Sequence, residues 1–172
     1  AIYLLVKIGL SYPFLFPISI LFICGFASTF LQLAHEGAHN CLGSKGFNSW
    51  FGNWMAAYPV GLDLDGYGIP HARHHAYLNS ALDSKTDSEK YRICDIRNPE
   101  LWLLFVKDLT GITAIKTRLS YGKEGNSKSL PGICLVQFLI IWLLFDLNLL
   151  HYAIFWVTPL ATVHMAFQRV RG

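Results

Sequence analysis

Two long runs without charged residues divide this sequence and limit its possible folds. Residues 8–35 carry no charge over 28 positions, and residues 129–168 carry only Asp146 over 40 positions. As helices they would span about 42 Å and about 60 Å, against a bilayer hydrocarbon core of about 30 Å. Hydrophobic residues make up 53% of the chain and charged residues 15%, whereas soluble domains have about 25% charged residues. We therefore expect an all-α integral membrane protein rather than a soluble enzyme, a coiled coil or a disordered chain.

Local breaks predict where the helices turn. A Ser-Tyr-Pro sequence at 11–13 interrupts the first run, so we expect residues 1–10 to end one membrane helix and 13–34 to form a full crossing. In the second run polar residues gather over 146–151, and this break predicts a transmembrane hairpin with arms at 130–146 and 151–168.

The residues between the two runs hold most of the charge. Eleven of the fourteen Lys and Arg lie within 35–129, and two more follow the second run, which leaves Lys7 alone on the other side. By the positive-inside rule this face is cytoplasmic. Residues 47–58 and 101–119 are apolar or aromatic but too short or too charged to span, so we expect helices lying in the membrane interface, the second starting near Pro99.

These patterns predict one domain over 1–172. Its expected parts are membrane helices over 1–34, a cytoplasmic and interfacial region over 35–129 and a transmembrane hairpin over 130–168. The chain begins at Ala1 within an apolar run, and we interpret it as a fragment of a longer protein.

Cysteine spacing and net charge exclude several classes. The four cysteines form no CxxC pair, which argues against a disulfide scaffold or a cysteine zinc site. The net charge of +3 is too small to indicate nucleic-acid binding.

Histidines are concentrated where the first run ends. Five of the seven fall in two groups, His35 with His39 and then His71, His74 and His75. The spacings i, i+4 and i, i+3, i+4 place each group on one helix face. Neutral imidazole is a good ligand for iron, zinc and copper, and five imidazoles exceed what one tetrahedral ion can use. The arithmetic predicts two metal ions sharing one site, whereas His151 is expected at the opposite face of the membrane.

A zinc metalloprotease is an open alternative. HEGAH at 35–39 matches the H-E-x-x-H pattern, in which Glu36 would be the general base. Asp63 or Asp65 could supply a third zinc ligand, but HARHH at 71–75 would then have no role.

HEGAHN at 35–40 and HARHH at 71–75, with 31 residues between His39 and His71, resemble the first two histidine boxes of the membrane fatty acid desaturases. The segment 47–79 is similar to the one that joins those boxes. The family carries a third box, HxxHH, beyond the last membrane helix. This chain stops at RVRG, so we expect an incomplete site that is inactive alone.

The resemblance implies oxygen-dependent desaturation of a lipid or fatty acyl chain, with no catalytic side chain beyond a di-iron centre. Dioxygen would be the co-substrate, and a separate ferredoxin or cytochrome b5-like protein would donate electrons. A carotenoid ketolase or lipid hydroxylase of the same histidine-box class stays open. The implied iron ligands are His35, His39, His71, His74 and His75.

Other residues would have to orient the ring nitrogen of each ligand that faces away from the metal. The candidates are Glu36, Asn40, Asp87 and His164. The acyl chain is expected in an apolar groove between the helix before the first box and the hairpin. Four tryptophans are candidates to line that groove or to anchor the chain at the interface: Trp50, Trp54, Trp102 and Trp142.

Overall fold

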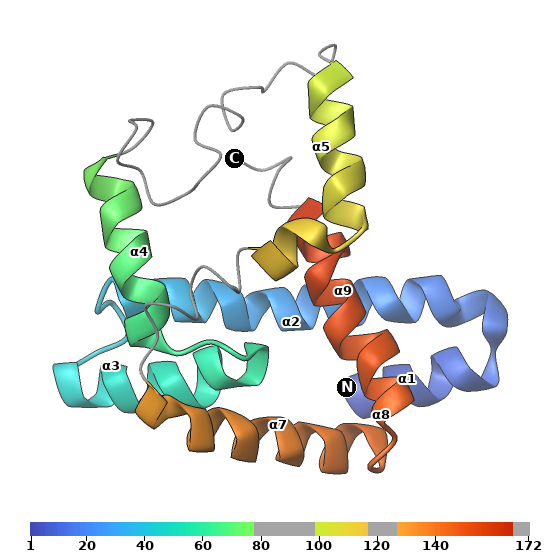
Figure 1. Cartoon of the computed structure of the whole chain (residues 1–172). Helices are drawn as coiled ribbons and strands as arrows, with labels where there is room; N and C mark the ends of the chain where they lie inside the picture. The colour runs from blue at the N-terminus through green and yellow to red at the C-terminus, as the bar shows by residue number, and fades with distance from the viewer. Residues whose placement is uncertain (78–98, 117–126, 167–172) are drawn as a thin grey trace.

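The computed structural model describes residues 1–77, 99–116 and 127–166, and within these ranges every regular element is helical. The chain opens with a helical hairpin, formed by α1 (Ile2–Ser11), the short η1 (Pro13–Leu15) and α2 (Phe16–Ala38) (Figure 1). Tyr12 is extended between them, so the turn falls at the predicted break. Gly9 allows the close approach, because a Cβ there would lie 3.1 Å from the Cβ of Ser19.

After α2 the chain returns along it in three short segments. These are α3 (Lys45–Phe51), the π-helical η2 (Gly52–Ala57) and η3 (Tyr58–Val60), which ends at Gly61 with φ of 69°. The sequence predicted an interfacial helix over 47–58. The helical state is confirmed, but η3 is buried and contacts the middle of a helix in the second apolar run.

That contact is a polar one inside apolar surroundings. The Gln137 side-chain amide donates to the carbonyl oxygens of Tyr58 at 2.5 Å and Pro59 at 3.0 Å, and its oxygen accepts from the Tyr152 hydroxyl at 2.5 Å. Trp156 Nε1 donates to the same Pro59 oxygen at 3.1 Å. Where water is excluded, unsatisfied backbone groups are costly, so these bonds stabilise η3 between the later helices.

The helix α4 (Leu64–Ala76) rises at a steep angle from the end of α2 (Figure 1). Asp63 caps its start, because the Asp63 side chain accepts a hydrogen bond from the backbone N–H of Gly66 at 2.7 Å. This is a favourable helix start, since it satisfies an N–H that the first turn leaves without a partner.

The helix α5 (Pro99–Leu109) begins where the sequence predicted a helix start. The predicted helix over 101–119 is interrupted, because Gly111 adopts a φ of 77° and ends the first part; residues 112–116 are helical again. The rest of that prediction, 117–119, lies outside the described residues.

The second apolar run forms η5 (Ser127–Ser129), α7 (Leu130–Phe145), α8 (Leu149–Tyr152), η6 (Ala153–Val157) and α9 (Thr158–Ala161). Helix stops after Phe145, because Asp146 and Leu147 both have positive φ, and Asn148 caps α8 by accepting from His151 N at 3.0 Å. The break in helix therefore falls where it was predicted.

Within the described residues, two helical stretches are long and apolar enough to cross a membrane, Pro13–Ala38 and Leu149–Ala166. The 16-residue α7 covers all but the last residue of the arm predicted over 130–146; at 1.5 Å per residue it is about 24 Å long, against about 30 Å for the bilayer core. At the turn after α7, Asp146 forms an ion pair with Lys7 of α1 at 2.8 Å. The apolar core lies between these helices, around Ile23, Phe145 and Phe155.

Candidate metal centre

Four of the five box histidines converge at the ends of α2 and α4. One nitrogen from each of His35, His39, His71 and His75 can be chosen so that all four lie within 4.8 Å of one another. The Nε2 atoms of His71 and His39 are 3.0 Å apart, and those of His75 and His71 are 3.1 Å apart. We call these four side chains the histidine group.

Helical spacing and helix packing together build the histidine group. Each helix contributes two imidazoles at i and i+4, one turn apart on one face. The last turns of α2 and the body of α4 pack together because small residues leave room at the junction. A Cβ on Gly37 would lie 3.1 Å from a methyl group of Leu64, so the leucine side chain fits directly against the α2 backbone.

Nitrogen donors at these separations suit a single metal ion. With metal–nitrogen bonds of about 2 Å, two ligands on opposite sides of an ion are about 4 Å apart, and neighbouring ligands are about 3 Å apart. The nitrogen–nitrogen spacings of 3.0 and 3.1 Å match neighbouring ligands. All four nitrogens lie within 4.8 Å of one another, so the most distant pair would have to move only slightly closer to bind one ion. No described carboxylate or thiol belongs to the group, so the donor set is imidazole alone.

His74 lies beside the histidine group and outside it. Its ring centroid is 6.4 Å from that of His71 and 5.7 Å from that of His75. The reason is angular: on a helix, position 74 is rotated by one residue from position 75, so the side chain points along a neighbouring face. The sequence predicted all five as ligands of one site, and the structure brings four together.

Of the residues expected to orient the ligands, Glu36 contacts one of them. Its Oε1 is 3.2 Å from Nδ1 of His35. A carboxylate at that nitrogen holds a proton there and leaves Nε2 with the lone pair that a metal needs. Both side chains are partly exposed.

The other orienting candidates have different partners or are not described. Asn40 adopts a φ of 58° just after α2, and its side-chain oxygen is 3.4 Å from Nδ2 of Asn48. His164 is buried, with its Nδ1 2.7 Å from the Ser28 hydroxyl on the middle of α2. Asp87 lies outside the described residues.

His151 belongs to α8, which lies at the end of the molecule opposite α4 (Figure 1). Its backbone N–H is bonded to the Asn148 side chain, and the residue takes no part in the histidine group. Asp63 caps α4 and Asp65 lies in its first turn, so neither offers the third ligand that a zinc protease would need.

One contact of the group was not predicted. The Tyr67 ring stacks on the His71 ring, with centroids 5.1 Å apart and planes 15° apart. Tyr67 precedes His71 by four residues, so the i, i+4 rule that paired the histidines would also have found it. Stacking restricts rotation of the His71 ring, which is the most buried of the four.

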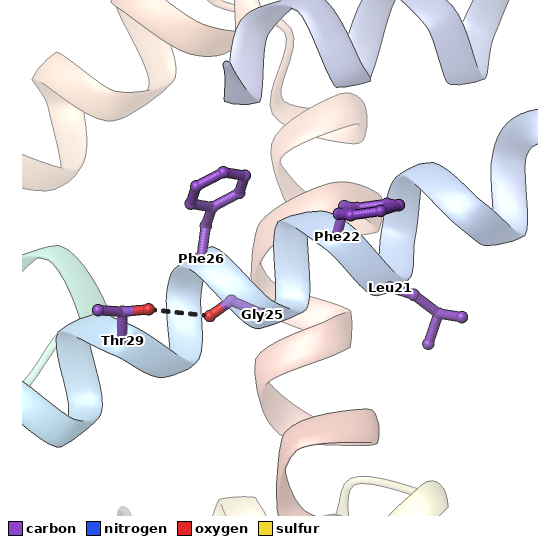
Figure 2. A pocket seen from close by; sticks show the side chains of 5 residues that line it. All are labelled: Leu21, Phe22, Gly25, Phe26 and Thr29. Carbon is purple, nitrogen blue, oxygen red and sulfur yellow. Dashed lines mark hydrogen bonds between the residues drawn. The ribbon is translucent and has the colours of Figure 1, made fainter.

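A shallow apolar hollow of about 390 Å³ lies on α2, away from the histidine group. Figure 2 shows Phe22 and Phe26 on one side of the helix, and Thr29 donating to the Gly25 carbonyl at 3.2 Å. Four tryptophans were candidates to line the expected groove, and none of them lines this hollow. Trp50, Trp102 and Trp142 are about half exposed, at 52–54%.

Comparison with known proteins identifies the family. The model of the fatty acid desaturase family matches residues 11–171, nearly the whole chain. No curated protein and no solved structure matches the chain. The chain therefore belongs to the fatty acid desaturase family, whose members are membrane-associated oxidoreductases that act on lipid substrates and generally use iron and dioxygen.

Proposed function

We propose that this protein takes part in oxygen-dependent desaturation of the acyl chain of a lipid or fatty acid, at iron held by the histidine group. The observation that carries the proposal is the convergence of four imidazole nitrogens within 4.8 Å from two separate helices. An acyl methylene group is not acidic, so removing its hydrogens requires an oxidant that side chains cannot provide. When bound, iron would supply the dioxygen and one-electron chemistry.

The chain's own residues hold and shape that site. His35, His39, His71 and His75 would be ligands to the first iron, and His74 a ligand to a second. Glu36, 3.2 Å from Nδ1 of His35, would hold a proton on that nitrogen and leave Nε2 free to bind the metal. Tyr67 limits rotation of the His71 ring, and the burial of His71 keeps water away from one side of the group.

The redox balance defines what partner the enzyme requires. Forming one double bond from two methylene groups releases two hydrogen atoms, and reducing dioxygen to two water molecules takes four electrons and four protons. The acyl chain supplies two of each, so two electrons must come from a donor and two protons from solvent. We propose a separate ferredoxin or cytochrome b5-like protein as that donor.

Apolar side chains exposed on α2 support a lipid substrate. Leu21 is 54% exposed, Phe22 59% and Phe26 43%, and all three border the hollow of Figure 2. In a membrane such a face contacts acyl chains rather than water. An acyl chain lying along α2 would run toward the end of the same helix, where His35 and His39 are placed.

The proposal is tested by the product. The full-length protein is incubated in membranes with a lipid extract, dioxygen and a reduced donor, and the fatty acids are analysed by mass spectrometry. We expect a product two hydrogens lighter than its precursor, lost when dioxygen is withheld. A product one oxygen heavier would instead establish a hydroxylase, and an oxygen-independent cleavage of peptide substrate would establish a hydrolase.

We also propose that the histidine group faces the cytoplasm. The basic residues of the sequence concentrate on the side of the boxes, and Lys7 is paired with Asp146 at the turn after α7. Cys41 is exposed next to the first box, so it reports this topology once Cys24, Cys94 and Cys134 are replaced by serine. A membrane-impermeant maleimide added to intact cells should leave Cys41 unlabelled until the membrane is opened. Labelling in intact cells would reverse the orientation.

A further inference from the structure

The segment Lys45–Ala57 combines α3 and η2, and its η2 part contacts both helices that carry the histidine group. It holds no histidine, and the proposed chemistry gives it no role. Two asparagines on this segment make side-chain hydrogen bonds to backbone groups. Asn48 bonds to the end of α2, and Asn53 bonds to the start of α4.

Asn48 fixes the end of α2. Its side chain is 2% exposed, and Nδ2 donates to the carbonyl oxygen of Gly37 at 2.9 Å. Its Oδ1 accepts from the backbone N–H of Leu42 at 3.1 Å. Gly37 lies between His35 and His39, so the bond holds the helix turn that carries both imidazoles. The same carbonyl oxygen also accepts from the backbone N–H of Asn40 at 3.0 Å, so both bonds hold the last turn of α2.

Asn53 fixes the start of α4. Its Oδ1 accepts from the backbone N–H of Leu64 at 2.9 Å, and Nδ2 donates to Ser49 O within its own segment at 3.0 Å. Leu64 is the first residue of α4, where N–H groups have no acceptor inside the helix. The bond therefore sets where α4 begins, and His71 and His75 follow along the same rigid helix.

Leu64 closes the junction between these two anchor points. Its side chain packs against Gly37 of α2 and Gly52 of η2, and a Cβ on Gly52 would be only 2.6 Å from Leu64 Cδ1. The three backbones thus meet around one leucine. Neither helix can shift against the other without breaking an asparagine bond or displacing this side chain.

We propose that Asn48 and Asn53 are positioning residues that act as a brace, setting the distance between the His35–His39 pair and the His71–His75 pair. The brace rests on the proposed metal site, because that distance matters only where all four imidazoles bind one ion. Two donor pairs carried on separate helices reach a common ion only when the helices are held in register. Residues that hold metal ligands in place typically affect metal affinity by about 10–100-fold.

The two asparagines act through different atoms, and this difference gives a sharp test. Aspartate has nearly the shape of asparagine but cannot donate a hydrogen bond. Asn48→Asp removes the donor to Gly37 O, whereas Asn53→Asp keeps the oxygen that accepts from Leu64 N. Leucine at either position removes every side-chain hydrogen bond.

The first measurement is the affinity of the purified apoprotein for Co²⁺ alone, followed by the visible absorption of the bound ion. Asn48→Leu, Asn48→Asp and Asn53→Leu should weaken binding by about 10–100-fold and change the spectrum. Asn53→Asp should stay within about twofold of the unchanged protein. Asn148→Leu is the matched control, since it removes a helix-capping amide on α8 and should also stay within about twofold. Equal affinity for Asn48→Asp and Asn53→Asp would overturn the brace.

The second measurement needs no metal. Spin labels at two exposed positions, Gln32 on α2 and Ala72 on α4, report the distance between the box helices in a background without the four native cysteines. We expect a single narrow distance that broadens in Asn48→Asp and Asn53→Leu but not in Asn53→Asp. If a leucine variant fails to fold, the two aspartate variants decide the result.

The two measurements separate the brace from the metal site. One outcome is that the unsubstituted protein binds no Co²⁺, while the narrow distance between the two spin labels broadens in Asn48→Asp. This outcome would contradict the metal site and support the brace. Co²⁺ binding and a distance that are both unaffected by Asn48→Asp would contradict the brace and support the metal site.

Discussion

Replacement of His71 by alanine should remove almost all metal from the protein. The His71 Nε2 lies 3.0 Å from that of His39 and 3.1 Å from that of His75, so it joins the two halves of the histidine group. Loss of a residue that supports a ligand typically lowers metal affinity by about 10–100-fold, and loss of a ligand itself should lower it further. We expect metal affinity to fall by more than about 100-fold and turnover to disappear. Elemental analysis and metal titration measure the first effect, and product formation measures the second.

Two other substitutions calibrate the His71→Ala result. His151→Ala removes an imidazole at the opposite end of the molecule and should leave the metal bound. Glu36→Gln should lower activity by about 10–100-fold and leave measurable turnover, because it removes only the carboxylate at Nδ1 of His35. In a zinc protease the order would reverse, since Glu36 would be the general base and His71 would not be needed. Activity that survives His71→Ala and is abolished in Glu36→Gln would therefore contradict the iron enzyme.

Replacement of His74 by alanine should abolish turnover while most of the first metal ion remains. The His74 ring is 5.7 Å from His75 and lies outside the histidine group, so its removal leaves the four converging nitrogens in place. The proposed second ion would lose a ligand, and reduction of dioxygen with coupled removal of two hydrogens would stop. The measurement combines metal content with product formation in the full-length protein.

His74→Ala also tests the assignment of two ions to the site. Arg73, the neighbour of His74 on α4, is exposed. Circular dichroism and thermal unfolding of the variant are compared with those of the unchanged protein, to verify that the fold is intact. Normal turnover in His74→Ala would reduce the site to the histidine group and a single ion. Complete loss of metal would instead make His74 a ligand of the first ion.

The helices and the pairing of histidines follow from local rules and were therefore predictable. The turn near Pro13, the start of α5 near Pro99 and the break after Phe145 each depend on a few neighbouring residues. The i, i+4 spacing in each box depends only on the helix. That the two pairs meet was expected from the number of imidazoles, and then from the resemblance to the desaturase family, and the structure brings them within hydrogen-bonding distance.

Features that depend on distant parts of the chain were not predicted. The burial of η3 depends on Gln137, a lone polar residue in an apolar run that is distant in sequence. The interruption at Gly111 also differs from the sequence prediction. Asn48 and Asn53 are common residues in a segment that reads as apolar and aromatic, so only their three-dimensional contacts distinguish them.

The central claim is that the histidine group binds iron through imidazole. X-ray absorption of the purified protein tests it directly, because it identifies the element and its neighbouring atoms in one measurement. We expect an iron edge, with nitrogen neighbours at about 2 Å and the outer scattering typical of imidazole rings, both lost in His71→Ala. Near-stoichiometric zinc without iron, or iron without imidazole scattering, would contradict the account.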